Sequence, residues 1–299
     1  MEILLSRLFA GTTAGALYIL IALALVVVFR SSSTINFAQG EFALFTAYVA
    51  WWLNGHGVPI WIALIPIMVL GFGMGALAER WLVRPVRRRD ESAVLIVCLA
   101  LFTGLNGLSG WIWGSEDKVF PRMFPHGEND YFSIAGARLH YDSILIMAVT
   151  TVVVIAVTVM FTKTDLGLQM RSVATNPESA ALCGIKVGRI LTLSWGISAA
   201  IGALAGAMII PILPPGQLGL SGMFHVLIFA TAGALLGGLD SIKGAVVGCL
   251  GLSVGLSLLN GYATFLHGSL SLTIALLVIV GVLVFKPTGL FGARQVERV

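Results

Sequence analysis

Nine stretches of this chain contain no Asp, Glu, Lys or Arg, so most of its length avoids charge altogether. They are residues 8–29, 42–53, 60–78, 92–113, 143–161, 190–210, 222–238, 244–261 and 270–285. At a rise of about 1.5 Å per residue, most can cross the roughly 30 Å hydrocarbon core of a bilayer as a helix, whereas 42–53 is too short. Hydrophobic residues make up 58% of the chain and charged ones 11%, a balance too apolar for one water-soluble core.

These stretches predict an all-α, polytopic integral membrane helix bundle of 8 to 9 membrane segments, in which the second segment is broken or short. Residues 1–299 are expected to form a single transmembrane domain surrounded by membrane lipid. The first apolar run is expected to remain as a span, because no obvious small-residue cleavage site follows it. Glycine pairs four residues apart, concentrated between residues 202 and 255, indicate helices that pack closely through small faces.

Basic residues gather in two short loops, which we expect on the cytoplasmic side because Lys and Arg are retained there. The first cluster is Arg80, Arg84, Arg87, Arg88 and Arg89, and the second is Lys163, Arg171, Lys186 and Arg189. The same alternation makes residues 114–142 an extracytoplasmic loop. The side of the N-terminus stays open, because Arg7 and Arg30 place one charge at each end of the first segment.

Several function classes are disfavoured by missing patterns. The chain has no G-x-x-x-x-G-K-[ST] loop, so it is expected to bind no ATP and no other cofactor itself. Its three cysteines and five histidines show neither metal-ligand spacing nor a nucleophile paired with a base, so we expect no enzyme. The short basic clusters indicate membrane topology and no nucleic acid partner. An ion-coupled carrier is disfavoured because the apolar segments contain no carboxylate, lysine or arginine.

A polar group interrupts the apolar chain within "INFAQGEFALF", residues 35–45. Asn36, Gln39, Gly40 and Glu41 stand directly before the short segment 42–53. One interpretation is an ordinary interfacial turn with Glu41 at the membrane surface. The other is a break in the second membrane segment.

The loop 162–189 contains a short helix with its own start and stop signals. Asn176 suits the N-cap, Pro177 the first helical position, and Glu178 the positive end of the helix dipole. Ala180 continues the helix and Gly184 can end it. A helix of about seven residues is marginal alone. The residues leave open whether it rests on the bilayer and its own bundle or docks into a partner.

Four segments resemble the permease subunits of branched-chain amino acid ABC importers, the Liv type. They are "GALYILIALALVVVFRSSSTINFAQGEFALFTAYVAW" (15–51), "MRSVATNPESAALCGIKVGRI" (170–190), "GALLGGLDSIKGAVVG" (233–248) and "FKPTGLFG" (285–292). The resemblance covers nearly the whole chain, and its four motifs stand in the family's order.

The resemblance implies a permease subunit of an ATP-binding-cassette importer in the bacterial cytoplasmic (inner) membrane. Its substrates would be branched-chain or similar small amino acids, short amides or urea. The implied partners are a second related permease, two cytoplasmic ATPases that bind ATP and Mg²⁺, and a periplasmic or other extracytoplasmic substrate-binding protein. An ATP-independent channel or secondary carrier for small polar solutes is the alternative.

The resemblance also implies roles for particular residues. In the family a coupling helix contacts the ATPase, and this role carries over to Arg171, Asn176, Pro177, Glu178, Ser179, Ala180 and Gly184. We expect residues 34–41 to break the second segment and to line a translocation path with Asn36, Gln39, Gly40 and Glu41, since unpaired backbone at membrane depth must face protein or water. Gln39 stands where the family usually has histidine, so a proton role there is in doubt. Asp240 replaces a common glycine.

Overall fold

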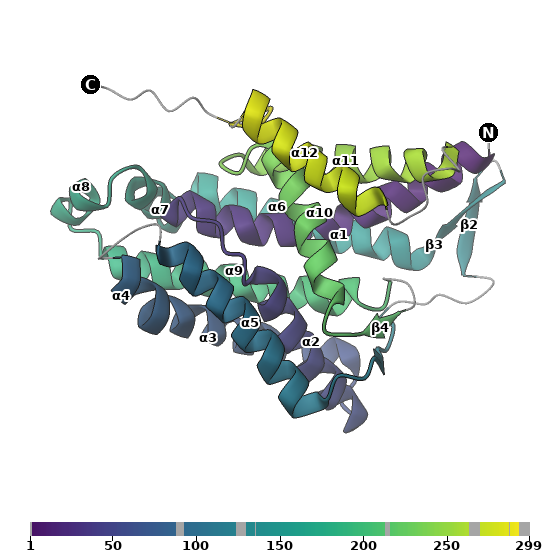
Figure 1. The fold of residues 1–299 in the computed structure, drawn as a ribbon, viewed down its shortest axis with the longest axis horizontal. Helices are drawn as coiled ribbons and strands as arrows, with labels where there is room; N and C mark the ends of the chain where they lie inside the picture. The colour runs from purple at the N-terminus through teal and green to yellow at the C-terminus, as the bar shows by residue number, and fades with distance from the viewer. Residues whose placement is uncertain are drawn as a thin grey trace. The chain divides into compact units, whose positions relative to one another are not determined.

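The computed structural model of the chain describes residues 2–87, 93–123, 130–134, 136–212, 216–262, 270–286 and 288–292. Arg88 and Arg89 of the first basic cluster lie outside the described residues. Figure 1 labels the helices: α1 (Glu2–Ser32), α2 (Gln39–Gly55), α3 (Ile60–Ala78), α4 (Arg84–Arg87), α5 (Ala93–Trp113), α6 (Tyr141–Lys163), α7 (Asp165–Thr175), α8 (Pro177–Leu182), α9 (Val187–Ile209), α10 (Gly222–Gly237), α11 (Ile242–Tyr262) and α12 (Leu270–Phe285).

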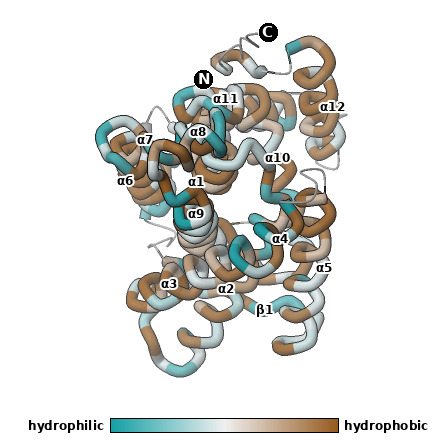
Figure 2. Tube along the Cα trace, turned by 90° about the vertical axis from the view of Figure 1, so that its left-hand side faces the viewer, coloured by the Kyte–Doolittle hydropathy of each residue, from teal (hydrophilic) through white to brown (hydrophobic). Residues whose placement is uncertain are grey.

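Each of the nine apolar stretches forms the body of a helix, which confirms the predicted all-α membrane fold. Within the described residues, six helical stretches are long and apolar enough to cross a membrane: α1, α3 with its continuation to Arg87, α5, α6, α9 and α11. Shorter apolar helices are α2, α10 and α12. In Figure 2, α3 is hydrophobic along most of its length, and hydrophilic residues gather at α4 and α8.

The chain divides into two compact units, which we describe separately. The first unit comprises Met1–Ala22, Phe124–Val154 and Ile228–Val299. Its core lies where α10, α11 and α12 meet, and is formed by Ala232, Leu252, Leu256 and Ala275. The aromatic rings of Tyr18 and Phe229 stack in the same unit, with their centroids 5.4 Å apart.

The second unit comprises Leu23–Met123 and Ile155–Leu227 and holds all the residues predicted to carry function. Its core joins the end of α1 to α2, α3, α5 and α9, through Val28, Ala38, Phe42, Ala78, Val83, Val94, Cys98, Trp195 and Ala199. Helix α9 is largely buried in this core, and Trp195 is only 1% exposed.

Three glycines, two on α3 and one on α9, allow close contact between α9 and the backbones of neighbouring helices. On α3, a Cβ at Gly75 would overlap the carbonyl oxygen of Trp195, and one at Gly71 would lie 2.8 Å from that of Ala199. On α9 itself, a Cβ at Gly206 would overlap the carbonyl oxygen of Ala43. The concentration predicted between residues 202 and 255 does mark close contacts, at Gly206 and where Gly233 and Gly237 on α10 meet Gly248 and Gly244 on α11. Gly71 and Gly75 lie outside that range.

A non-helical stretch precedes the second apolar segment, but it is shorter than the predicted break at residues 34–41, because Gln39, Gly40 and Glu41 already belong to helix α2. Helix α1 ends at Ser32, and Ser33 adopts a left-handed conformation with φ 55°, which is uncommon for a residue other than glycine. Residues 34–38 are not helical, and α2 begins at Gln39. Helix α2 is thus preceded by a turn at residues 37–38 rather than by continuous helix.

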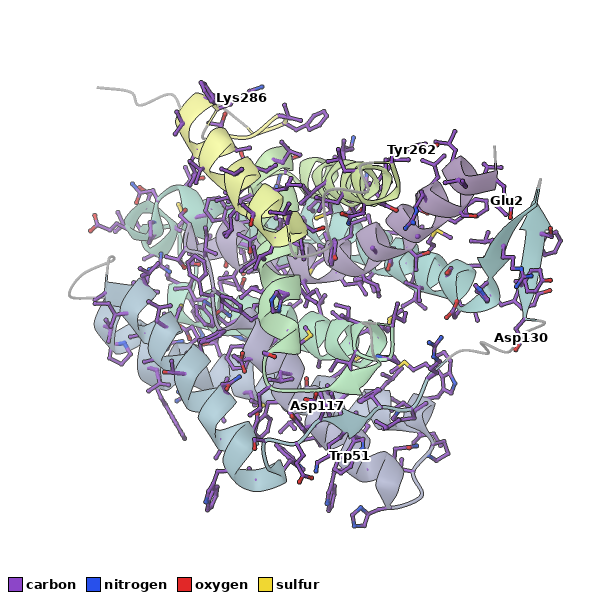
Figure 3. The ribbon with its side chains drawn as sticks, turned by 45° about the vertical axis from the view of Figure 1, so that its right-hand side comes forward. Glu2, Trp51, Asp117, Asp130, Tyr262 and Lys286 are labelled. Carbon is purple, nitrogen blue, oxygen red and sulfur yellow. The ribbon has the colours of Figure 1, made fainter. Side chains whose placement is uncertain are left out.

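Two short antiparallel strand pairs lie outside the helices and were not predicted. Strand β1 (Lys118–Val119) pairs with β4 (Gln217–Leu218), and β2 (Tyr131–Ile134) pairs with β3 (Ala137–His140). Gly136, with φ +85°, supplies the left-handed turn between β2 and β3. Near β1, Asp117, labelled in Figure 3, lies against Gly219. Three of these strands lie within the predicted extracytoplasmic loop 114–142.

The loop 162–189 contains two helices where the sequence predicted one. The Thr164 side chain caps α7 by accepting a hydrogen bond from the Gly167 backbone N–H (3.3 Å). A Cβ at Gly167 would overlap the backbone at Met160, so α7 folds back tightly on the end of α6. The signal for α7 was present in this threonine cap.

Candidate functional site

The first group of predicted residues forms the start of α2. Asn36 accepts a hydrogen bond from the Ala38 backbone N–H (3.0 Å) through Oδ1. Its Nδ2 donates to Oε1 of Gln39 (3.5 Å). Asn36 is 1% exposed and Gln39 is fully buried, so the turn into α2 lies inside the protein rather than at a membrane surface.

Gln39 connects this turn to the middle of α9 by hydrogen bonds. Its Nε2 donates to the carbonyl oxygen of Ser198 (3.2 Å), and its Oε1 lies 2.9 Å from the Ser198 hydroxyl. The same hydroxyl is 2.7 Å from the carbonyl oxygen of Ala24 on α1. A Cβ at Gly202 would overlap Nε2 of Gln39, so the glycine leaves the space that this amide occupies.

Gly40 and Glu41 face two further helices. A Cβ at Gly40 would lie 3.3 Å from the carbonyl oxygen of Met223, at the start of α10. Glu41 is fully buried, and its Oε2 accepts a hydrogen bond from Nδ2 of Asn106 on α5 (3.0 Å). The four predicted residues therefore lie together at a junction of α2 with α5, α9 and α10.

The second group of predicted residues surrounds α8. The Asn176 side chain accepts a hydrogen bond from the Ser179 backbone N–H (2.9 Å), and Pro177 occupies the first turn. Gly184 has φ +83°, and its N–H donates to the carbonyl oxygen of Ala181 (2.9 Å). The predicted cap, first-turn proline and terminating glycine are all confirmed.

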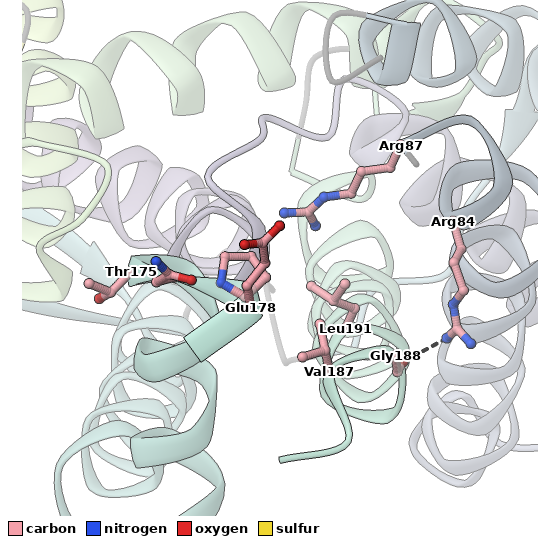
Figure 4. Close-up of a pocket in the computed structure, with 9 residues that line it drawn as sticks. Arg84, Arg87, Thr175, Glu178, Val187, Gly188 and Leu191 are labelled. Atoms are coloured by element: carbon pink, nitrogen blue, oxygen red, sulfur yellow. Dashed lines mark hydrogen bonds between the residues drawn. The ribbon is translucent and has the colours of Figure 1, made fainter. Parts of the chain in front are cut away.

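A cavity of about 610 Å³ separates the beginning of α8 from α4 and the first turns of α9. It is lined by Arg84, Arg87, Thr175, Asn176, Pro177, Glu178, Val187, Gly188 and Leu191. Figure 4 shows Glu178 and Arg87 pointing toward one another from α8 and α4. The cavity thus brings opposite charges to facing walls.

Arg84, one of the residues that line this cavity, forms a partly buried ion pair with Glu79. Arg84 donates to both carboxylate oxygens of Glu79, from Nε to Oε1 (3.0 Å) and from Nη2 to Oε2 (2.6 Å). The Thr192 hydroxyl on α9 donates to Oε2 of Glu79 (2.6 Å), and Nη2 of Arg84 lies 2.6 Å from the carbonyl oxygen of Gly188. These contacts join the end of α3 to the beginning of α9.

A second cavity, of about 460 Å³, lies between α7 and α8. It is lined by Leu168, Arg171, Ser172, Thr175, Asn176, Ser179, Ala180, Cys183 and Ile185. Nε of Arg171 donates to the carbonyl oxygen of Gly167 one turn earlier (3.3 Å). Arg171, Ser179 and Ala180 are thereby gathered on one side of α8, away from Glu178.

The two groups of residues are separate in space, but both contact α9. Gly188 and Leu191, at its start, line the larger cavity, and Ser198 and Gly202, in its middle, hold Gln39. From Leu191 to Ser198 is about two helical turns, roughly 10 Å along the axis. A rigid movement of α9 would therefore displace side chains in both groups.

Sequence reasoning missed Glu79, Arg84 and Thr192 as a cluster, and Asn106 as the partner of Glu41. The sequence contained a usable signal for Glu79 and Arg84. Glu79 is the first acidic residue after a long apolar stretch, and a basic cluster follows it. The turn η1 (Glu79–Val83) is a π-helix, a form often found at functional positions. Asn106 also carried a signal, because it is the one amide side chain in the apolar stretch 92–113, and amides in membrane helices hydrogen-bond to neighbouring helices.

These features define a class of protein: a polytopic membrane subunit with a polar junction in its interior and a capped helix in its basic loop. The chain belongs to the family described as "Branched-chain amino acid transport system / permease component", whose profile matches residues 7–285. It is therefore a transporter permease component and not an enzyme.

Similar proteins extend over almost the whole chain. The permease protein LivH of the high-affinity branched-chain amino acid transport system of Escherichia coli K12 is 29% identical, over 99% of this chain and 97% of its own. BraD of Pseudomonas aeruginosa, described in the same words, is also 29% identical, over 99% and 98%. Among solved structures, "PsaBC from Streptococcus pneumoniae in complex with Fab" aligns at 15% identity with a TM-score of 0.46, over 96% and 91% of the two chains.

Proposed function

We propose that this chain is a permease subunit of an ATP-driven importer in the bacterial inner membrane, moving branched-chain or similar small amino acids inward. A second related permease completes the membrane part, two cytoplasmic ATPases bind ATP and Mg²⁺, and a soluble binding protein delivers substrate from outside. LivH and BraD, both described as branched-chain amino acid permeases, support this substrate class.

The observation that carries the proposal is the geometry of α8. Six residues make too short a helix to persist without contacts, yet this one is capped at both ends. Its outer face is open, and Leu182 is 90% exposed. An exposed, preformed helix with one apolar and one acidic position suits a groove on a partner. The partner that this family requires at such a helix is the ATPase.

Movement of α8 reaches the membrane interior through α9. The larger cavity separates α8 from α4, so closure of an attached ATPase can push Glu178 toward Arg87. The ion pair of Glu79 and Arg84 holds the beginning of α9 to the end of α3, which makes these two helices move together. Gln39 then receives the movement at Ser198.

The junction around Gln39 and Glu41 is the proposed translocation path in its closed state. Asn36, Gln39 and Glu41 are buried, Gln39 is bonded to α9 and Glu41 to α5, so these groups are closed to solvent in this conformation. Separation of α2 from α9 would expose the amides of Asn36 and Gln39. Such weak, exchangeable hydrogen bonds suit a permease that must release its substrate.

The same arrangement supports an extracytoplasmic N-terminus. Arg87 of the first basic cluster donates to the carbonyl oxygen of Ser32 (3.1 Å), so the end of α1 lies beside that cluster. The cluster belongs on the cytoplasmic side. Because α1 is one helix of 31 residues, roughly 46 Å long, its beginning lies on the opposite side. A cysteine at Ser6 should react with an impermeant maleimide in intact cells.

The test of the proposed function is purification from native membranes followed by reconstitution. The wild-type chain should bring down P-loop ATPases, and the complex with its binding protein should accumulate leucine in proteoliposomes only with ATP. Replacing Asn176, Pro177 and Glu178 together by glycine should remove the ATPases. If the purified chain alone moves solute without ATP, the channel or carrier function takes the place of this proposal.

A further inference from the structure

The carboxyl group of Glu41 has a hydrogen-bond partner for one of its two oxygens. The residue is fully buried, and Oε2 accepts one hydrogen bond, from Asn106. Within the described part of the chain, Oε1 has no hydrogen-bond partner. A buried carboxylate oxygen without a donor is strongly unfavourable, and ionisable groups at membrane depth are usually retained for function.

Capping of α2 does not account for this carboxylate. Glu41 lies in the first turn, where a negative charge is favourable, and a capping side chain would accept hydrogen bonds from the first-turn N–H groups. The Ala38 backbone N–H is bonded to Asn36, and the Glu41 backbone N–H donates to the carbonyl oxygen of Ala38 (3.0 Å), so the Glu41 side chain caps neither of them. The side chain is instead directed at α5.

Asn106 prepares the carboxylate for a ligand rather than neutralising it. Its Nδ2 donates both to Oε2 of Glu41 and to the carbonyl oxygen of Leu220 (2.9 Å). One amide nitrogen thus orients the carboxyl group between α2 and the segment before α10. Asn106 supplies no positive charge, so it does not compete with a cation that carries N–H donors for this carboxyl group.

We propose that Glu41, positioned by Asn106, is a subsite that binds the ammonium group of an α-amino acid during passage through the permease. This inference rests on the proposed function. An ammonium group has three N–H donors and a full positive charge, which match an unpaired carboxylate oxygen better than a neutral amide does. The subsite fits one end common to all α-amino acids and leaves selection among their side chains to other groups.

The test measures ligand binding to the intact transporter complex in lipid nanodiscs, without the binding protein. The probes are leucine, leucinamide, 4-methylpentanamide and 4-methylpentanoate. The first two carry an ammonium group, the third only amide N–H donors, and the fourth only a carboxylate. We expect saturation-transfer NMR to detect leucine and leucinamide alone. Glu41→Gln, which keeps the shape but removes the charge, should weaken both by about tenfold or more.

Tyr48→Phe is the matched control. Tyr48 is also fully buried on α2, and its hydroxyl has no hydrogen-bond partner within the described residues, but it carries no charge. It should bind both ammonium probes like wild type. Three results would each overturn the subsite. They are binding of leucine by the Glu41→Gln complex as strong as by wild type, binding of 4-methylpentanamide as strong as that of leucinamide, and no binding of any probe to wild type.

A separate measurement distinguishes this inference from the proposed function. Uptake of leucine by the complete wild-type complex, with binding protein and ATP, tests the importer alone. ATP-driven uptake that is unchanged in Glu41→Gln leaves the importer standing and removes the subsite. No ATP-driven uptake by wild type removes the importer itself. If the subsite exists, Glu41→Gln should lower uptake while ATP hydrolysis stimulated by the loaded binding protein continues.

Discussion

Arg84 donates two hydrogen bonds, of 3.0 and 2.6 Å, to the Glu79 carboxylate across a π-helical turn at the end of α3. Glu79 is 1% exposed, whereas the Arg84 side chain is 28% exposed. The pair therefore sits at the edge of the buried region, with its negative member inside. Thr192 extends it to α9, so one bidentate contact joins three elements of the second unit.

Glu79→Gln should destabilise the protein by about 3 kcal/mol, because Arg84 would lose the charge that compensates its partial burial. Thermal unfolding in detergent measures this loss. Glu116→Gln is the control, since Glu116 is 88% exposed in its 3.5 Å contact with Lys118 and should contribute less than about 1 kcal/mol. Equal losses in the two variants would contradict the structural role of Glu79.

Glu178→Arg should uncouple ATP hydrolysis from uptake. The new guanidinium would face Arg87 across the larger cavity, so repulsion would oppose the approach of α8 to α4. We expect hydrolysis to continue while leucine uptake falls at least several-fold in proteoliposomes. Glu178→Gln removes attraction without adding repulsion and should have an intermediate effect. Wild-type coupling in Glu178→Arg would exclude this cavity from transmission.

Asn176→Ala should weaken ATPase binding by loosening α8. The Ser179 backbone N–H would lose its acceptor, a change that typically costs about 1 kcal/mol of helix stability. Co-purification of the ATPases at increasing salt measures the effect. Asn176→Asp keeps a capping oxygen and should retain them. Identical behaviour of the two variants would mean that the cap does not matter for docking.

Gly202→Ala should destabilise the junction by about 1–3 kcal/mol, because its Cβ would overlap the Gln39 amide. Gly104→Ala, in α5, is the control: no atom lies within 4 Å of its Cβ position, so the substitution should be neutral or stabilising by up to about 1 kcal/mol. Unfolding of both variants in nanodiscs provides the comparison. A stabilised Gly202→Ala would show that Gln39 is free to move.

Cys183 should react with an impermeant maleimide from the cytoplasmic side only, and bound ATPases should protect it. It is exposed at the end of α8, whereas Cys98 and Cys249 are buried. Labelling of inverted vesicles, before and after removal of the ATPases, checks both points without a mutation. Labelling in intact cells would reverse the assigned topology, and unchanged labelling with ATPases bound would place their contact elsewhere.

Much of the fold could be predicted because lipid imposes simple rules on sequence. Uncharged length predicted the positions of the nine apolar helices, and local chemistry at Asn176, Pro177 and Gly184 predicted α8 nearly to the residue. Helix α7 was missed although its threonine cap is followed by an amphipathic pattern, in which Gly167, Met170 and Val173 are buried.

The partners of the candidate site could not be predicted from local patterns. Gln39 meets Ser198 and Glu41 meets Asn106 across 159 and 65 residues of chain, and nothing in the neighbourhood of either residue encodes such a contact. The sequence could show that polar side chains interrupt the second segment. Which of them is satisfied by α9, and which retains an unpaired oxygen, depends on how the helices pack.

The π turn at residues 79–83 has a consequence for insertions and deletions in this region. The Arg84 backbone N–H donates to the carbonyl oxygen of Glu79, five residues back, so the turn holds one residue more than an α-helical turn. Deleting one residue between Glu79 and Arg84 would leave the four-residue spacing of an ordinary α-helical turn, so the helix after it would keep nearly the same orientation. Arg84 would then stand four residues after Glu79 on the same helix face, so this turn can lose one residue and keep its ion pair.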